Sequence, residues 1–228
     1  MDSKKGLVVV VGSSGDIARS VIKVLKDNNY MVKAMTRTPS EDEIHIDVTS
    51  DESVKRAFES VFSLHERIYS VLYFPAITKD KLIHNQGIDD WQSVIDVNLL
   101  GAVRVVKNVL PHFIKNREGI FQFLSSTAAV RGATGAAAYS CSKAALNMLA
   151  KNIANDYGCF NVRAYTVMPG YIDGGMLKNL PQDKREAVRK NIALQRMANV
   201  QEIANFCVGL LAISDYLTGT TLTLDGGM

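Results

Sequence analysis

Cysteine is scarce in this sequence, and long hydrophobic runs are missing. The 228 residues include three cysteines, Cys141, Cys159 and Cys207, which are odd in number and lack the spacing of metal ligands. We therefore expect free thiols in a reducing compartment, the cytoplasm, and no metal site. The apolar run 7–11 stops at Gly12 and is too short for a membrane span or for the core of a signal peptide. No membrane partner is expected.

An excess of charge of one sign is also absent. The 26 lysines and arginines are scattered among 23 aspartates and glutamates, which leaves a net charge of +3. Proteins that bind nucleic acid carry basic residues clustered on one face or in one segment. No nucleic-acid partner is therefore expected.

What the sequence does contain is a regular alternation of short apolar segments. No linker or repeat divides it, and 47% of its residues are hydrophobic, so residues 1–228 are predicted to form one domain. Short runs closed by glycine or proline predict strands at 7–11, 31–35, 44–48, 71–74, 120–124, 162–167 and 220–224. Periodicity predicts helices at 16–27, 51–66 (capped by Asp51), within 88–116, at 137–157 and at 200–212. This alternation predicts an α/β fold, a single doubly wound parallel sheet with helices on both faces, whose ligands bind beyond the carboxyl ends of the strands.

A small-residue loop follows the first predicted strand and opens the first predicted helix. It reads Gly12-Ser13-Ser14-Gly15-Asp16-Ile17, and glycines let a backbone approach a pyrophosphate at a helix N-terminus. The usual second and third glycines fall on Asp16 and Ala18. The loop is therefore equally typical of a nucleotide site and of an ordinary tight turn.

The end of the second predicted strand bears on the choice of nicotinamide cofactor. An acidic residue there accepts bonds from the ribose hydroxyls of NAD, whereas an arginine accommodates the extra phosphate of NADP. This sequence has Arg37 between two threonines and no acidic residue before Glu41. The pattern favours NADP(H) over NAD(H); the alternative is an exposed loop arginine.

Tyr139 and Lys143 are four residues apart in the predicted helix 137–157. That spacing places both side chains on one helix face, where a cation would lower the pKa of the phenol toward the range useful for acid–base catalysis. A lone pair of this kind is more often part of an amphipathic surface. The interpretation therefore depends on the residues that accompany it.

Those residues make the chain resemble the short-chain dehydrogenase/reductase family over essentially its whole length. Ser126 precedes Tyr139 by thirteen residues, and Asn98 occupies the position of the family's catalytic asparagine. The pair Asp47-Val48 and the turn Pro169-Gly170 match the adenine and nicotinamide sides of the family's cofactor site. The resemblance implies a Rossmann fold and an NAD(P)-dependent oxidoreductase. It implies cofactor contacts from Gly12, Ser13, Ser14, Gly15, Asp16, Ile17, Arg37, Asp47, Val48, Pro75, Ala76, Tyr139, Lys143, Pro169, Gly170 and Ile172.

The family also implies a role for each catalytic residue. Tyr139 would give a proton to the substrate oxygen as hydride reaches carbon, and Ser126 would bond that oxygen. Lys143 would hold the ribose hydroxyls and lower the pKa of Tyr139, and Asn98 would fix a water that links Lys143 to solvent. The histidines at 45, 65, 84 and 112 fall on no catalytic position of the family and are interpreted as incidental.

Several positions depart from the family pattern. The family's Asn-Asn-Ala-Gly is replaced by Tyr73-Phe-Pro-Ala76, and Pro75 lacks a backbone donor. The threonine expected four residues after Pro169-Gly170 is Gly174. With Asp16 and Ala18, these changes predict a weaker or unusually oriented cofactor. Two further residues are given packing roles: Cys141 in the core, and Trp91 at the start of the long helix.

The segment 171–199 is predicted to cover the substrate. It mixes apolar residues with basic ones, which suits an acyl chain presented by an acidic carrier protein but equally suits a solvated amphipathic lid. Within the family the closest similarity is to 3-oxoacyl-[acyl-carrier-protein] reductases, so we expect reduction of a ketone or acyl thioester. A sugar or polyol dehydrogenase and a non-catalytic nucleotide-sensing or scaffold protein are the alternatives. The resemblance also implies a homo-oligomer, a dimer or tetramer, built through the long helix and the Tyr139 helix.

Overall fold

A seven-stranded parallel sheet forms the centre of the molecule in the computed structural model, which describes residues 5–64, 67–174 and 181–228. Its strand order is β3-β2-β1-β4-β5-β6-β7. The chain therefore starts in the middle of the sheet and winds first to one edge and then to the other. The strands are β1 (Lys5–Val11), β2 (Tyr30–Thr36), β3 (Ile44–His45), β4 (Ile68–Tyr73), β5 (Gly119–Leu124), β6 (Val162–Pro169) and β7 (Thr221–Leu224).

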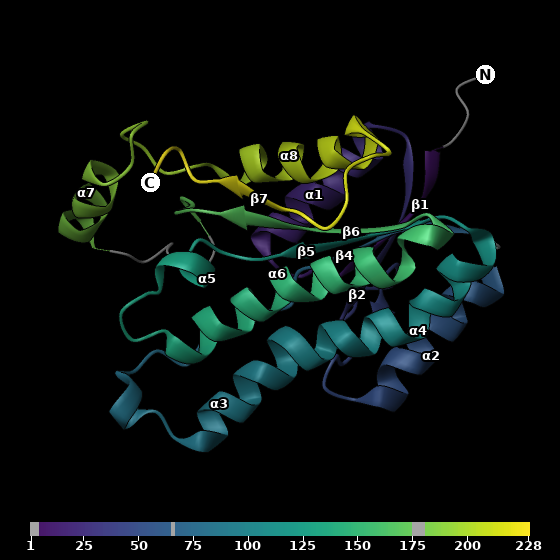
Figure 1. Ribbon diagram of the computed structural model, residues 1–228, viewed down its shortest axis with the longest axis horizontal. Helices are drawn as coiled ribbons and strands as arrows, with labels where there is room; N and C mark the ends of the chain where they lie inside the picture. The colour runs from purple at the N-terminus through teal and green to yellow at the C-terminus, as the bar shows by residue number, and fades with distance from the viewer. Residues whose placement is uncertain (1–4, 65–66, 175–180) are drawn as a thin grey trace.

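Helices cover both faces of this sheet, as Figure 1 shows, with α1 and α8 on one side and α2, α4 and α6 on the other. The predicted doubly wound α/β architecture is thus confirmed. The helices are α1 (Asp16–Asp27), α2 (Asp51–Leu64), α3 (Ile88–Ile95), α4 (Gly101–Asn116), α5 (Ala128–Arg131), α6 (Ala137–Tyr157), α7 (Gln182–Lys190) and α8 (Val200–Ile213). Short turns η1 (Ile83–Asn85) and η3 (Gly158–Phe160) are 3₁₀-helical, and η2 (Asp96–Leu100) is a π-helical turn.

The valine run of β1 explains why this strand occupies the middle of the sheet. Val8 to Val11 are fully buried, and successive side chains point to opposite faces. Val9 and Val11 therefore join the core under α2, α4 and α6, whereas Val8 and Val10 join the core under α1 and α8. A strand that is covered on both faces needs apolar residues at every position.

Several predicted boundaries are wrong in detail. The strand expected at 44–48 is only Ile44–His45, and the strand expected at 71–74 begins at Ile68. The cap of α2 is Ser50, whose hydroxyl accepts a bond from the Ser53 amide at 3.2 Å, rather than Asp51. Residues 65 and 66, at the predicted end of this helix, lie outside the described residues.

The long helix predicted within 88–116 consists of α3 and α4, joined through the π-helical turn η2. Beside this turn the hydroxyl of Tyr73 donates to the carbonyl of Val97 at 2.5 Å. Gly101 makes room for the phenol, because a Cβ at that position would lie 2.4 Å from the Tyr73 oxygen. The end of β4 and the turn that carries Asn98 are therefore held together by this contact.

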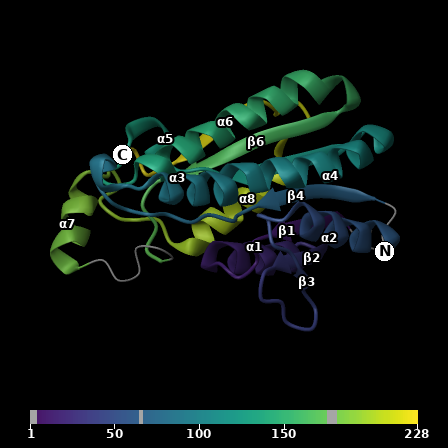
Figure 2. The ribbon, with the colours of Figure 1, turned by 90° about the horizontal axis from the view of Figure 1, so that it is seen from below.

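The connection between β2 and β3 is unusually short. It consists of residues 37–43, all described and none helical, so seven residues (43 − 36 = 7) join two parallel strands. Parallel strands ordinarily need a dozen or more connecting residues, most often a helix. Figure 2 shows a bare loop beside the β3 label at this edge of the sheet.

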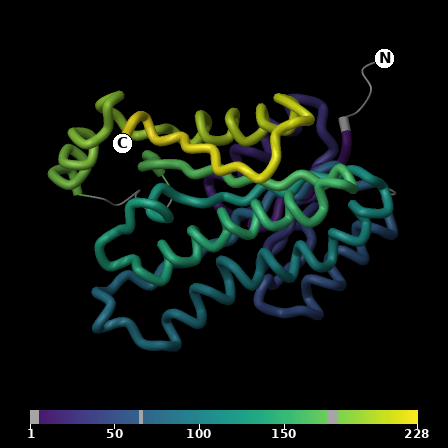
Figure 3. Tube along the Cα trace, in the orientation of Figure 1, coloured from purple at the N-terminus to yellow at the C-terminus, as the bar shows by residue number. Residues whose placement is uncertain are grey.

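The chain after β7 returns to the segment that follows α7, as the trace in Figure 3 shows. The amides of Ala193 and Leu194 donate to the carbonyls of Gly227 and Gly226. Segments far apart in the sequence thus meet at the end of the molecule where α7 lies.

Gly101→Ala should lower the free energy of unfolding by about 1–3 kcal/mol, because its methyl group would overlap the Tyr73 hydroxyl and Val48. Gly209→Ala is a matched control, since Gly209 also lies in a helix but has nothing within 4 Å of its Cβ position. That change should raise the free energy of unfolding by about 0.5–1 kcal/mol. Urea denaturation measures both, and equal effects would contradict the packing described at Tyr73.

Candidate active site

A cleft of about 770 Å³ lies beyond the carboxyl ends of the central strands. Its wall includes Gly12 after β1, Phe74 and Ala76 after β4, and Leu124 at the end of β5 with residues 125–127 beyond it. It is completed by Tyr139 and Lys143 of α6 and by the turn that begins with Pro169 at the end of β6. The predicted position of the site, along one edge of the sheet, agrees with this cleft.

Three of the four predicted catalytic residues line the cleft together: Ser126, Tyr139 and Lys143. The Lys143 ammonium lies 5.6 Å from the centre of the Tyr139 ring, as expected for residues one helical turn apart. Lys143 is only 1% exposed, and its Nζ donates to the carbonyl of Leu124 at 2.6 Å. The side chain is therefore anchored to the end of β5.

Burial dominates the electrostatics of Tyr139 and Lys143. Burial raises the pKa of Tyr139, a hydrogen bond with Ser126 lowers it, and the negative charge of Asp80 raises it further, so that it ends above its ordinary value. Burial lowers the pKa of Lys143 to about 7. Burial thus sets the net direction of both shifts, and the lowering of the Tyr139 pKa by the charge of Lys143 stays a prediction.

Asn98 lies behind the cleft and is fully buried. Its Oδ1 accepts from the Ile77 amide at 2.8 Å, and its Nδ2 donates to the Ile77 carbonyl at 3.0 Å and to the Ser142 hydroxyl at 2.9 Å. Ser142 in turn donates to the carbonyl of Tyr139 at 2.7 Å. Both amide hydrogens thus have protein partners, and any water fixed here as predicted would have to bond an oxygen of Asn98.

The glycine loop fits the pyrophosphate of a dinucleotide. Gly12 has a φ of +81°, and a Cβ there would lie 2.9 Å from Pro75, so the proline ring packs directly on this glycine. A Cβ on Gly15 would meet only the Gly12 carbonyl at 3.9 Å, which leaves the start of α1 open. Asp16 and Ile17, the first residues of α1, line the cleft. A helix N-terminus beside an open glycine suits a bound phosphate.

The predicted contacts on the adenosine side lie outside the lining of the cleft. Arg37 is exposed, and its charge helps to keep the pKa of Asp47 low, after the larger effect of the Thr49 hydroxyl and amide. The Asp47 carboxylate accepts from those two groups at 2.7 and 2.9 Å. Val48 packs against Gly101 in the core. The carboxylate that reaches the glycine loop is Glu43, which accepts a bond from the Ser13 hydroxyl at 2.5 Å.

The sequence analysis missed two functional candidates, Ser142 and Glu43. Ser142 could have been noticed, since it lies three residues after Tyr139, whereas Glu43 had no signal because only the short β2–β3 loop brings it to Ser13. The substrate end of the cleft adds a mixture of polar, charged and small side chains. These are Thr78, Asp80, Thr127, Ala128, Arg131, Gly132, Ala133, Ala136, Tyr171, Gly174 and Asn191. The predicted lid residues Met176, Leu177, Lys178 and Leu180 lie outside the described residues.

The cysteines are free thiols, as predicted. Cys141 is exposed, however, so its predicted place in the core is wrong; two residues beyond Tyr139, it faces away from the sheet. No group of histidine, cysteine or acidic residues suited to a metal ion occurs among the described residues. Within the same residues, no helix is long and apolar enough to cross a membrane.

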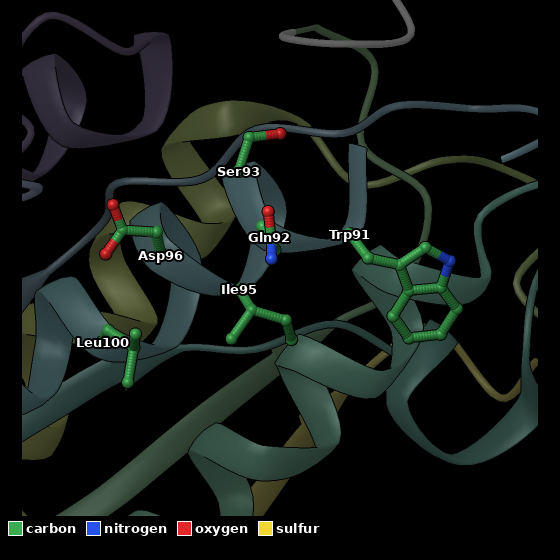
Figure 4. Close-up of a pocket in the computed structure, with 6 residues that line it drawn as sticks. All are labelled: Trp91, Gln92, Ser93, Ile95, Asp96 and Leu100. Carbon is green, nitrogen blue, oxygen red and sulfur yellow. The ribbon is translucent and has the colours of Figure 1, made fainter. Parts of the chain in front are cut away.

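A second pocket, of about 490 Å³, lies along α3 and η2 rather than at the strand ends. Figure 4 shows the side chains of Trp91, Ile95 and Leu100 along one flank of these elements. Leu100 is 43% exposed. This apolar flank belongs to the long helix that was predicted to form a subunit interface.

Lys143→Met should make the stability of the protein less dependent on pH. Between about pH 7, where the buried lysine loses its proton, and about pH 10, where the lysine of the unfolded chain does, the unfolded state binds more protons. Lys143 thus lowers the free energy of unfolding by an amount that grows as the pH falls from about 10 to about 7 and is constant below pH 7. As the pH falls from about 10 to about 7, the free energy of unfolding of Lys143→Met should therefore rise relative to that of wild type by on the order of a few kcal/mol.

Urea unfolding at both pH values measures this difference, with Lys151→Met, an exposed lysine of α6, as the control. The same pH dependence in the two variants would show that Lys143 is not desolvated.

Comparison with known proteins agrees with this geometry. Residues 18–228 match a family model described as "Enoyl-(Acyl carrier protein) reductase". The chain is 32% identical to the 3-oxoacyl-[acyl-carrier-protein] reductase of Aquifex aeolicus, over 97% of this chain and 86% of that protein. It is 31% identical to the protein of the same name from Thermotoga maritima, over 99% of this chain and 89% of the relative.

A solved structure is also similar. The ligand-free aldohexose dehydrogenase of Thermoplasma acidophilum superimposes with a TM-score of 0.90 at 27% identity, covering 98% of this chain and 94% of that one. The chain therefore belongs to the short-chain dehydrogenase/reductase family of nicotinamide-dependent oxidoreductases.

Proposed function

We propose that this enzyme uses NADPH to reduce the ketone of a 3-oxoacyl thioester. The observation that carries the proposal is one continuous cleft, with the glycine loop at one end and Ser126, Tyr139 and buried Lys143 at the other. A dinucleotide laid along it would place its reactive ring beside the phenol. The relatives named as 3-oxoacyl reductases supply the substrate class.

The bound cofactor would supply the hydride, and the protein supplies orientation and a proton. Tyr139 donates its phenolic proton to the carbonyl oxygen of the substrate, while the Ser126 hydroxyl donates a second hydrogen bond to that oxygen. The raised pKa of Tyr139 keeps its proton in place at neutral pH, which suits the reductive direction. Lys143, near neutrality in pKa, is placed to exchange a proton beside the phenol and to bond the ribose hydroxyls.

Asn98 is assigned a positioning role. Its amide joins Ile77, after β4, to Ser142, which bonds the backbone of Tyr139. Both segments line or support the cleft, so the amide sets the distance between the loop after β4 and the catalytic turn of α6.

The choice of NADPH rests on Arg37. It lies one residue beyond β2, at the strand end where an arginine accommodates the additional phosphate. Its side chain is exposed, so the guanidinium can turn toward an anion. The contacts of Gly12, Pro169, Gly170 and Ile172 with the cofactor are part of the same proposal.

An acidic carrier protein is the proposed source of the acyl thioester. Helix α7 carries four basic residues, Lys184, Arg185, Arg189 and Lys190. Asn191, which follows this helix, lines the cleft. Arg185 is already paired with Asp173 at 2.5 Å, which leaves Arg189 as the better candidate for contact with a partner. Within the segment 171–199, we assign residues 171–174 and 181–199 to the lid that covers the substrate.

A sugar or polyol is the second candidate substrate. The substrate end of the cleft contains Thr78, Asp80, Arg131 and Asn191, which can bond hydroxyl groups. The similar structure is named an aldohexose dehydrogenase. Oxidation of a sugar would use the same residues, with Tyr139 accepting the proton instead.

A homo-oligomer completes the proposal. The apolar flank of Trp91, Ile95 and Leu100 and the exposed Met148 of α6 offer a surface for a second copy along the long helix and α6. The free thiols favour the cytoplasm as its compartment.

Tyr139→Phe should abolish reduction, by about a hundredfold or more in kcat, because it removes the proton donor and little else. Oxidation of NADPH by an acetoacetyl thioester is followed through the absorbance of the reduced nicotinamide, alongside reduction of NADP by glucose in the reverse direction. Activity on the thioester supports the first candidate, and activity on glucose alone supports the second. A variant as active as wild type would refute the role of Tyr139, provided that NADPH binding is equal in the two proteins.

Arg189→Glu should raise KM about tenfold for a substrate carried by acyl carrier protein and leave KM unchanged for the uncharged N-acetylcysteamine thioester. Lys26→Glu, an equal charge change at the end of α1, serves as the control. Equal loss with both substrates would show that Arg189 supports the active site instead of a carrier.

A further inference from the structure

The Glu43 carboxylate is held against the glycine loop by three hydrogen bonds. One oxygen accepts from the Ser13 hydroxyl at 2.5 Å, and the other accepts from the amide and hydroxyl of Ser40 at 3.1 and 3.0 Å. Ser13 is only 1% exposed, so its hydroxyl has a fixed position within the loop. The carboxylate is therefore a defined part of the loop's surroundings.

The short connection between β2 and β3 brings Glu43 to this place. The amides of Gly12 and Ser13 both donate to the carbonyl of Met35 in β2, so the glycine loop lies against the end of that strand. A helical crossover would carry the chain away from this point, but the seven-residue loop turns back to it at once. No acidic residue directly follows β2 in the sequence, but in space Glu43 lies beside the end of this strand through its bond with Ser13.

The charges around Glu43 keep its carboxyl ionised. Its hydrogen bond from Ser13, followed by the bond from the Ser40 amide, holds its pKa below the usual value, and Arg19 of α1 contributes in the same direction. Arg37, on the same loop, acts on Asp47. The remaining acids of the loop, Glu41 and Asp42, are exposed. A negative charge thus persists beside the glycine loop throughout the neutral range.

In this fold the ribose end of the cofactor is recognised near the end of the second strand, and the amides of Gly12 and Ser13 bond that strand end at the Met35 carbonyl. A carboxylate there accepts hydrogen bonds from the ribose hydroxyls of NAD and repels the 2′-phosphate of NADP. Arg37 would instead attract the 2′-phosphate of NADP. Because Glu43 and Arg37 come from one loop, the preference between the two cofactors depends on the balance of their charges.

We propose that Glu43 is a specificity-determining residue that opposes Arg37 and holds the preference for NADPH over NADH well below what Arg37 alone would give. The proposal rests on the proposed cofactor site. It assigns to the β2–β3 loop, which lacks the usual helix, the recognition of the ribose end of the cofactor.

A purely structural role is the competing explanation. Glu43 joins Ser13 to Ser40, and loss of that link would loosen the loop. Such loosening would weaken NADPH and NADH alike, whereas a specificity role changes the ratio of their dissociation constants. That ratio separates the two explanations.

The test is calorimetric titration of the purified protein with NADPH and with NADH, in wild type, Glu43→Gln and Glu41→Gln. Glutamine keeps the size and one acceptor of the side chain and removes the charge, and Glu41→Gln makes the same charge change two residues away. The ratio of Kd for NADH to Kd for NADPH should rise about tenfold in Glu43→Gln and stay within about twofold in Glu41→Gln.

Ser13→Ala gives a second measurement that leaves the net charge unchanged. It removes the hydroxyl that holds the carboxylate in place, so the ratio should rise in the same direction. An unchanged ratio in both Glu43→Gln and Ser13→Ala, or an equal weakening of both cofactors, overturns the role of Glu43 and leaves the proposed function standing. Failure of wild type to bind either cofactor would overturn both.

Discussion

The Asn98 amide is the contact on which the rest of the site depends. Through Ile77 it holds the segment after β4, and through Ser142 it holds the turn of α6 that carries Tyr139 and Lys143. The group is fully buried, and each bond is made where water cannot replace it. Two further bonds join the end of β5 to α6, from Lys143 to the Leu124 carbonyl at 2.6 Å and from the Ser125 hydroxyl to the Lys143 carbonyl at 3.1 Å. The Asn98 amide adds the segment after β4 to the same helix.

Two of the departures from the family pattern, Tyr73 and Pro75, make contacts that support the site. Tyr73 fills the space above Gly101 and bonds the carbonyl of Val97, next to Asn98. Pro75 needs no amide hydrogen where it lies, because its ring packs on Gly12 and thereby supports the glycine loop. The predicted weakening or reorientation of the cofactor stays a prediction.

Electrostatics, by contrast, are decided by burial. The pair Tyr139 and Lys143 has the spacing expected for a cation beside a phenol, yet both neutral forms are favoured. The reason is that a side chain with 1% exposure loses the hydration of its charge, and a single carbonyl, that of Leu124, replaces only part of it. An arrangement of this kind keeps the tyrosine proton available and lets the lysine change charge near neutral pH.

What the sequence by itself determined is local or repetitive. The valine run of β1, the alternation of strands and helices and the four-residue spacing of Tyr139 and Lys143 all depend on neighbours along the chain, and they were enough for the fold class and for the position of the cleft. Tertiary structure alone decided which groups face one another across long separations. Glu43 meets Ser13 and Asn98 meets Ile77 and Ser142 because strand register and loop length bring them together, and no periodicity in the chain encodes such distances. The same holds for the depth at which Lys143 is buried, which is set by the elements that pack over it.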